Sequence, residues 1–138
     1  MRSVAIPVFE NSTSEPDLGS IFAGALRNEF LLRGQLQVVP VEQAEAIFRG
    51  RMTSVFSSAV AHREAEATIQ TRLYLTLEIK CVDVRDGSIL WQDPSFTYYQ
   101  TFIQSSDPNV SFTNRRAAIE LLAREMSVRI HDRFLSNF

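Results

Sequence analysis

The stretch VAIPVFENSTSEPDLGSIFAGALRNEFLLR, residues 4–33, contains a strand followed by a helix and decides how the remaining chain can fold. Residues 4–9 are almost all apolar, which predicts a strand, and the polar residues 10–16 predict a turn. Residues 17–33 carry apolar side chains three or four positions apart, which predicts an amphipathic helix. Such a helix buries only one stripe, so the rest of the chain has to supply a sheet that covers it.

Residue types with known positional preferences mark both ends of this helix. Ser14, Pro16 and Asp17 are favoured at or near a helix start, where an acidic side chain also suits the helix dipole. Gly34 is favoured directly after a helix end, because glycine adopts the left-handed conformation without steric cost. The predicted buried stripe comprises Leu18, Ile21, Phe22, Ala25, Leu26 and Phe30.

Four more strands are predicted after this helix, at residues 36–39, 46–60, 72–81 and 89–103. In the third of them, apolar and polar residues alternate without interruption, which predicts one buried and one wet face. In the second, Phe48, Met52 and Phe56 are predicted to share the buried face. The polar residues 62–66 predict a strand connection, and an Asp-Gly pair at residues 86–87 predicts a tight hairpin turn.

A second helix is predicted from residue 111 or 114 to residue 135, with a length of about 30 Å. The middle strands are apolar on one side only, so both helices are predicted to cover that side. The predicted fold class is an α+β two-layer sandwich with two helices packed on one face of a mixed four- to five-stranded sheet. Residues 1–138 are predicted to form a single domain, and the other sheet face is predicted to stay open.

Composition and residue spacing exclude several functional classes. The net charge of −2 gives no concentrated basic surface of the kind that nucleic acid needs. His62 and His131 fit no metal-ligand spacing, and both are predicted to lie at the surface. Cys81 is the only cysteine and is predicted to be a small buried residue of its strand. We therefore predict a protein that is not an enzyme, with no catalytic residues, no metal site and no cofactor.

The open face of the sheet is predicted to collect basic and aromatic side chains. Its predicted members are Arg49, Arg51, Arg72, Tyr74, Lys80, Thr97, Tyr99 and Thr101, together with the single acid Glu78. Arginine grips phosphate oxygens in pairs, and tyrosine offers an apolar ring with a polar tip, so this surface suits a phosphorylated or carboxylated amphiphile. An ordinary solvated sheet face also carries such residues, and the pattern alone leaves both interpretations open.

Several segments in order along the chain resemble the lipopolysaccharide-assembly lipoprotein (LptE) family. The resemblance begins with VAIPVFENST at residues 4–13, followed by Glu15-Pro16, an amphipathic helix and Arg33-Gly34. It continues in VVP at 38–40, EQAEA at 42–46, Gly50 with Thr53, DGSILW at 86–91 and residues 115–138. The resemblance covers almost the whole chain and implies two helices on one face of a four- to five-stranded sheet.

This resemblance also implies a function and a location. It implies a Gram-negative outer-membrane lipoprotein that faces the periplasm, binds lipopolysaccharide and plugs an LptD-type barrel. The resemblance implies membrane association through an N-terminal lipid on a cysteine that follows a signal peptide. The signal peptide is absent from this chain, and so is the lipidated cysteine, because the only cysteine, Cys81, lies in a predicted strand. The expected lipopolysaccharide contacts are Arg63, Arg72, Arg115 and Arg116, with Arg49, Arg51, Tyr74 and Lys80 as candidates on the open face.

The first forty residues also resemble a second class of envelope proteins. The apolar strand, the Phe-Glu-Asn sequence at 9–11 and the following helix are similar to the amino-terminal domain of TolB and to the CsgG and LpoB lipoproteins. This likeness implies a periplasmic interaction or secretion module without a lipopolysaccharide ligand. The LptE resemblance extends past the hairpin at residues 86–87 and is therefore preferred.

Overall fold

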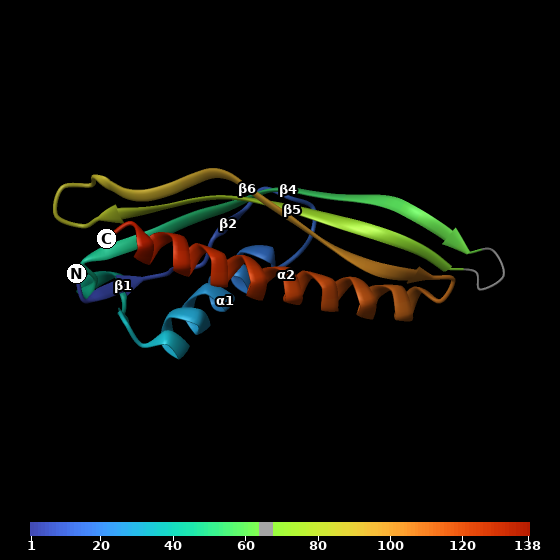
Figure 1. Cartoon of the computed structure of the whole chain (residues 1–138), viewed down its shortest axis with the longest axis horizontal. Coiled ribbons are helices and arrows are strands. Elements are labelled where there is room, and N and C mark those ends of the chain that lie inside the picture. The colour runs from blue at the N-terminus through green and yellow to red at the C-terminus, as the bar shows by residue number, and fades with distance from the viewer. Residues whose placement is uncertain (64–67) are drawn as a thin grey trace.

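The computed structural model describes residues 1–63 and 68–138, with the side chains of residues 62 and 63 excluded. Its elements are β1 (Ser3–Ala5), β2 (Glu10–Asn11), α1 (Leu18–Arg33), β3 (Gln37–Val38), the 3-10 helix η1 (Val41–Gln43), β4 (Ala46–Arg63), β5 (Thr68–Asp83), β6 (Ile89–Ser105) and α2 (Pro108–Ser136) (Figure 1). The predicted connection at residues 62–66 lies largely outside the described residues, as do the side chain of His62 and residues 64 and 66.

The strands form one mixed sheet in the order β3-β1-β4-β5-β6, with β2 also paired to β4. β1 runs parallel to β3 and β4, whereas β4, β5 and β6 form an antiparallel meander. Both helices pack on the same side of this sheet (Figure 1). The predicted α+β sandwich with two helices on one face is confirmed.

The predicted first strand, residues 4–9, is shorter than expected: β1 ends at Ala5, and a second short strand, β2, lies at residues predicted to form the turn. β1 pairs with the start of β4 and β2 pairs with it again at Arg51 and Met52. Pro7 lies between the two short strands, and proline has no N–H to donate to a ladder. Pro7 therefore favours the gap between β1 and β2.

The three long strands extend well beyond the short ones, so the sheet has two halves of different width (Figure 1). We call residues 54–63, 68–77 and 96–105 the distal half, and the remaining parts of β4, β5 and β6 the proximal half. α1, β1, β2 and β3 gather at the proximal half, and α2 alone extends along the distal half (Figure 1). The distal half is therefore a three-stranded sheet covered by one helix.

A β-bulge in β4 reverses the expected alternation. Met52 pairs with Leu77 and Ser54 pairs with Thr76, so Thr53 is an extra residue on the β4 side. Beyond it, Phe56 is 60% exposed on the side away from the helices. The prediction that Phe56 shares the buried face with Phe48 and Met52 is wrong, because the inserted residue moves the side chains from Ser54 to Ala59 to the other face, up to the second register shift at Val60.

The core is formed by the two helices and the helix-facing side of the strands. Phe30 of α1, Phe48 of β4 and Phe134 of α2 meet with ring centroids 5.0–6.2 Å apart. Gly34 ends α1 with a φ of 71°, and its N–H donates to the carbonyl of Phe30, as predicted.

His131 is 1% exposed and lies 4.8 Å from the Phe30 ring, so its predicted surface position is wrong. α1 packs against this side of α2 and also covers Ser127, one turn earlier. The buried stripe of α2 is therefore wider than it would be if the helix packed on the sheet alone, because α2 packs on both the sheet and α1.

α2 begins earlier than predicted, at Pro108. The Asp107 side chain accepts a hydrogen bond from the Asn109 N–H at 2.9 Å, and Pro108 occupies the first helical turn. Its 29 residues span roughly 43 Å, which lets it follow both halves of the sheet.

Candidate functional site

The open face is the side of β4, β5 and β6 that points away from the helices. The residues used below are Arg49, Arg51 and Phe56 of β4; Arg72, Tyr74, Glu78 and Lys80 of β5; and Thr97, Tyr99, Thr101 and Ile103 of β6. All the side chains predicted for this face from the alternation lie on it. No helix or strand within residues 1–63 and 68–138 covers it (Figure 1).

Two unpaired cations lie side by side in the proximal half of the open face. Arg49 and Lys80 are directly opposite each other on β4 and β5. Like charges in this position repel, and among the described residues no carboxylate lies within 4 Å of either. The neighbouring Arg51, by contrast, donates to Glu78 at 3.1 Å. We call Arg49 and Lys80 the cationic pair.

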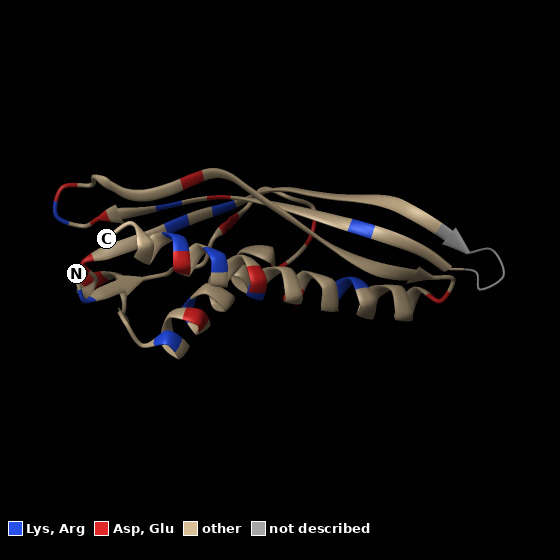
Figure 2. Ribbon diagram, in the orientation of Figure 1, with Lys and Arg blue, Asp and Glu red and all other residues tan. Residues whose placement is uncertain are grey.

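A hollow of about 450 Å³ lies beside the cationic pair. Its lining comes from β4, β5, β6 and β2, namely Glu10, Arg49, Gly50, Arg51, Glu78, Ile79, Lys80, Ile89, Gln92 and Pro94. Basic positions gather on neighbouring strands in this part of the sheet (Figure 2). The hollow therefore combines cationic groups with a local break in the sheet where the register of β5 and β6 shifts.

The distal half of the open face carries a ladder of aromatic rings. Phe56, Tyr74 and Tyr99 are cross-strand neighbours, with centroid distances of 6.1 and 5.4 Å. The Arg72 guanidinium carbon lies 4.8 Å above the Tyr99 ring, which is a cation–π contact. A hydrogen bond to Tyr74 and the nearby Tyr99 raise the pKa of Arg72, so it stays charged.

We call these four residues the aromatic ladder. Tyr74 and Lys80 are six residues apart on one strand, so the ladder lies about 20 Å from the cationic pair. Sequence reasoning missed Phe56, because only the β4–β5 register reveals the bulge that exposes it.

The four predicted lipopolysaccharide contacts do not share one surface. Arg72 lies on the open face, whereas Arg115 and Arg116 belong to α2, on the other side of the sheet. Arg115 donates to the Glu15 carboxylate at 2.7 Å and to the Ser57 hydroxyl at 2.9 Å, and Arg116 lies 3.8 Å from Glu120. Arg63 ends β4, and its side chain lies outside the described residues.

Groups that often carry catalysis are buried or dispersed in the described part of the chain. Burial raises the pKa of the Cys81 thiol to about 12, and the side chain is fully enclosed, as predicted. Residues 1–63 and 68–138 contain no cluster of three potential metal ligands. None of the described helices has the length and hydropathy that a membrane crossing requires.

Comparison with known families decides which of the two resemblances applies. A family model described as lipopolysaccharide-assembly, LptE, matches residues 1–134. The chain belongs to the LptE family. This membership assigns the LptE-family chain a role in lipopolysaccharide assembly and in building the outer membrane. The family is known for assembly rather than for catalysis.

Solved structures from several bacteria share the fold of this LptE-family chain. A putative lipoprotein from Caulobacter crescentus CB15 is 14% identical, with a TM-score of 0.62 and 93% of this chain and 88% of that chain covered. A Xanthomonas campestris protein is 12% identical, with a TM-score of 0.60 and coverages of 91% and 79%. A hypothetical protein from Chlamydia trachomatis is 10% identical, with a TM-score of 0.56 and coverages of 99% and 92%.

At these identities the likeness shows the fold alone. No curated protein matches this chain significantly.

Proposed function

We propose that this protein binds lipopolysaccharide on its open face and plugs an LptD-type outer-membrane barrel, helping to insert lipopolysaccharide into the outer leaflet. It would be a lipid-anchored lipoprotein at the periplasmic side of the outer membrane. Family membership supports the partner and the ligand. The observation that carries the site is the cationic pair, Arg49 and Lys80.

The cationic pair suits a phosphate because the two like charges repel each other unless an anion is bound between them. Two opposed like charges cost free energy in the empty sheet, and a bound phosphate removes that cost while it gains charge-assisted hydrogen bonds. Arginine can offer two parallel donors, and lysine adds a compact point charge. A phosphorylated glycolipid therefore gains more from this pair than a neutral lipid does.

The aromatic ladder offers the complementary surface for the less polar parts of the same ligand. Tyr99 and Phe56 are 50% and 60% exposed, and Thr97 and Thr101 border them with hydroxyl groups. Exposed rings provide apolar contact at a low cost in side-chain entropy, and each tyrosine adds a polar hydroxyl. A ligand about 20 Å long could contact both the pair and the ladder.

The predicted contacts at Arg63, Arg115 and Arg116 are a separate proposal. They lie off the open face or outside the described side chains, so a ligand on the open face does not need them. Reversing their charges together with that of Arg72 tests the original set of four. Unchanged affinity in that quadruple variant, with loss in the Arg49/Lys80 variant, would restrict the site to the open face.

Binding is tested with purified protein and lipopolysaccharide, comparing the R49E/K80E variant with an R2E/R124E control of equal net charge. Arg2 and Arg124 are exposed and do not line the hollow. Each lost charged hydrogen bond costs about 1.5–3 kcal/mol, so the affinity of R49E/K80E should fall at least about tenfold. Dephosphorylated lipopolysaccharide should bind the wild type as weakly as R49E/K80E binds the intact ligand. Equal affinity of both variants would contradict the site.

The partner is tested by co-purifying the full-length lipoprotein from a Gram-negative envelope and identifying bound proteins by mass spectrometry. A barrel protein in near-equal amount is the expected result. A peptidoglycan synthase or a secretion pore in its place would move the protein to the class of TolB, CsgG and LpoB.

A further inference from the structure

The outer edge of β6 is the longest strand edge in the described part of the chain that no other strand covers. β6 ends the sheet order, so its outer backbone groups pair with no described strand. Residues 96–105, FTYYQTFIQS, contain no charge, no proline and no glycine. Their pairing with β5 runs without a register shift from Phe96 to Ser105. A straight, uncharged edge of this length is a template for another strand.

The remaining free edges of the same strands are blunted. Beyond β2, the outer edge of β4 is interrupted by the extra residues Thr53 and Val60, where its register with β5 shifts. The beginning of β6 carries Asp93 and Pro94. Bulges, charges and proline are the devices by which proteins prevent edge pairing. Their absence from residues 96–105 therefore singles out this edge.

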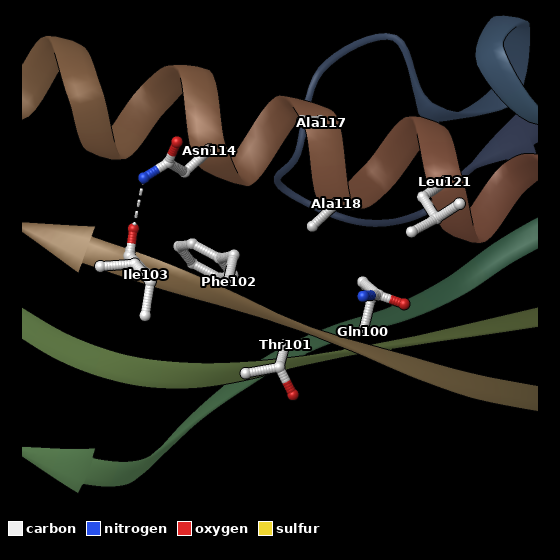
Figure 3. A pocket seen from close by; sticks show the side chains of 8 residues that line it. All are labelled: Gln100, Thr101, Phe102, Ile103, Asn114, Ala117, Ala118 and Leu121. Carbon is white, nitrogen blue, oxygen red and sulfur yellow. Dashed lines mark hydrogen bonds between the residues drawn. The ribbon is translucent and has the colours of Figure 1, made fainter.

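A hydrogen bond shows which residues of β6 direct their backbone outward. The Asn114 side chain donates to the carbonyl of Ile103 at 2.9 Å (Figure 3). The N–H and C=O groups of one residue point to the same side of a strand, and the side alternates along the chain. Thr101 and Tyr99 therefore also direct their backbone groups away from β5. Asn114 already occupies the Ile103 carbonyl, and the Ser111 hydroxyl occupies both backbone groups of Ser105. The outward groups left for an added strand are therefore those of Tyr99 and Thr101 and of residues before them.

A groove of about 300 Å³ lies between this edge and α2. Ala117, Ala118 and Leu121 of α2 face Gln100 and Phe102 of β6 across it (Figure 3). Apart from Asn114, the lining side chains on the helix are small or apolar. An extended strand beside β6 would place alternate side chains into this groove.

We propose that residues 97–101 pair with an extended segment of the barrel protein, which adds a strand to the sheet along β6. The segment has small or apolar side chains opposite Ala117 and Leu121. It also carries an acidic one near Arg129, whose guanidinium lies 4.7 Å over the Tyr98 ring with no carboxylate within 4 Å among the described residues. Main-chain hydrogen bonds supply affinity, and the groove and Arg129 supply selectivity. This inference rests on the proposed function, because it assigns a contact to the partner named there.

A second copy of this chain does not fit the same edge. α2 packs over β6 and barely contacts β5. Neighbouring strands lie about 4.8 Å apart, whereas packed helices need about 8–10 Å between their axes. Pairing β6 with β6 of another copy would force the two α2 helices into the same space. A lone strand meets no such obstacle.

Two variants test the edge in the full-length lipoprotein, with barrel recovery from the envelope as the first measurement. Thr101→Pro removes an outward N–H, and Ala117→Arg fills the groove from an exposed helical position that tolerates arginine. Their controls are Thr101→Val, which keeps the backbone donor, and Asn28→Arg on the exposed side of α1. Circular dichroism verifies that each variant is folded. Hydrogen exchange of residues 96–105 in the complex and in the free protein is the second measurement.

We expect Thr101→Pro and Ala117→Arg to lower barrel recovery at least tenfold and the controls to match the wild type. The outward amides of Tyr99 and Thr101 should be protected only in the complex, whereas the alternate amides already pair with β5 in both states. Wild-type recovery by Ala117→Arg, with equal exchange in both states, overturns the edge and leaves the proposed function intact. Absence of any barrel from the wild-type sample overturns the proposed function and the edge with it. A wild-type homodimer that Ala117→Arg dissociates identifies a second copy as the occupant and overturns the inference.

Discussion

Replacing Arg115 with alanine should lower the stability of this protein by about 2 kcal/mol. The guanidinium joins α2 to Glu15 in the loop before α1, 100 residues away, at 2.7 and 3.1 Å, and to Ser57 in β4 at 2.9 Å. Only 17% of the Glu15 side chain and 29% of the Arg115 side chain are exposed. Truncation would leave a largely covered carboxylate without its partner, and hydrogen bonds to charged groups contribute about 1.5–3 kcal/mol.

Thermal unfolding followed by circular dichroism measures this loss. For a chain of 138 residues, about 2 kcal/mol corresponds to a decrease of roughly 6–8 °C in Tm. Arg124→Ala is the matched control, because Arg124 is exposed on the same helix and should change stability by less than about 0.5 kcal/mol.

A double-mutant cycle with Glu15→Gln isolates the pair, and its coupling energy should exceed about 1 kcal/mol. A Tm of Arg115→Ala within 2 °C of the wild type, or a coupling near zero, would refute the structural role. Arg115 would then be available for the predicted lipopolysaccharide contact.

Three further predictions concern residues of the sheet. Gly50→Ala should destabilise the protein by about 1–3 kcal/mol in denaturant titrations, because its Cβ would lie 2.9 Å from the buried Phe9 ring; an unchanged midpoint would show that the ring moves freely. Hydrogen bonds from the Arg85 side chain lower the pKa of Asp83. The ionised carboxylate therefore stabilises the fold at pH values above the ordinary carboxyl pKa of about 3.9, and this stabilisation is lost as the pH falls through the lowered pKa. The Tm difference between the wild type and Asp83→Asn should therefore be constant from pH 7 to about pH 5 and close in more acidic solution; a difference that widens below pH 4 would contradict this assignment. Cys81 should resist iodoacetamide at pH 8 in the folded protein and react after denaturation, as mass spectrometry would show, whereas rapid labelling of the native state would mean that the sheet opens at this strand.

The elements that depend on short-range patterns could be predicted from the sequence. The 3.6-residue spacing in residues 18–33 and the period of two in residues 72–81 report directly which side of each element is apolar. The same alternation correctly assigned Arg49, Lys80, Tyr74 and Tyr99 to the open face. Gly34 ended α1 because a left-handed residue is a local requirement. Asp107-Pro108 is also a local helix-start signal, although the predicted start was residue 111 or 114.

The rest depended on pairings between distant segments. The extra residue at Thr53 exists only relative to β5, so no pattern within β4 predicts that Phe56 is exposed. His131 is buried because α1 happens to pack against that side of α2.

For this protein, the sequence by itself determined the layers, the faces of β5 and β6 and the family resemblance, because each follows from patterns that are local along the chain. Only the tertiary structure decided that Arg49 and Lys80 oppose each other, that Arg115 is engaged by Glu15, and that the edge of β6 is left open beside α2. These features arise from strand register and helix placement, which are set by the packing of the whole core.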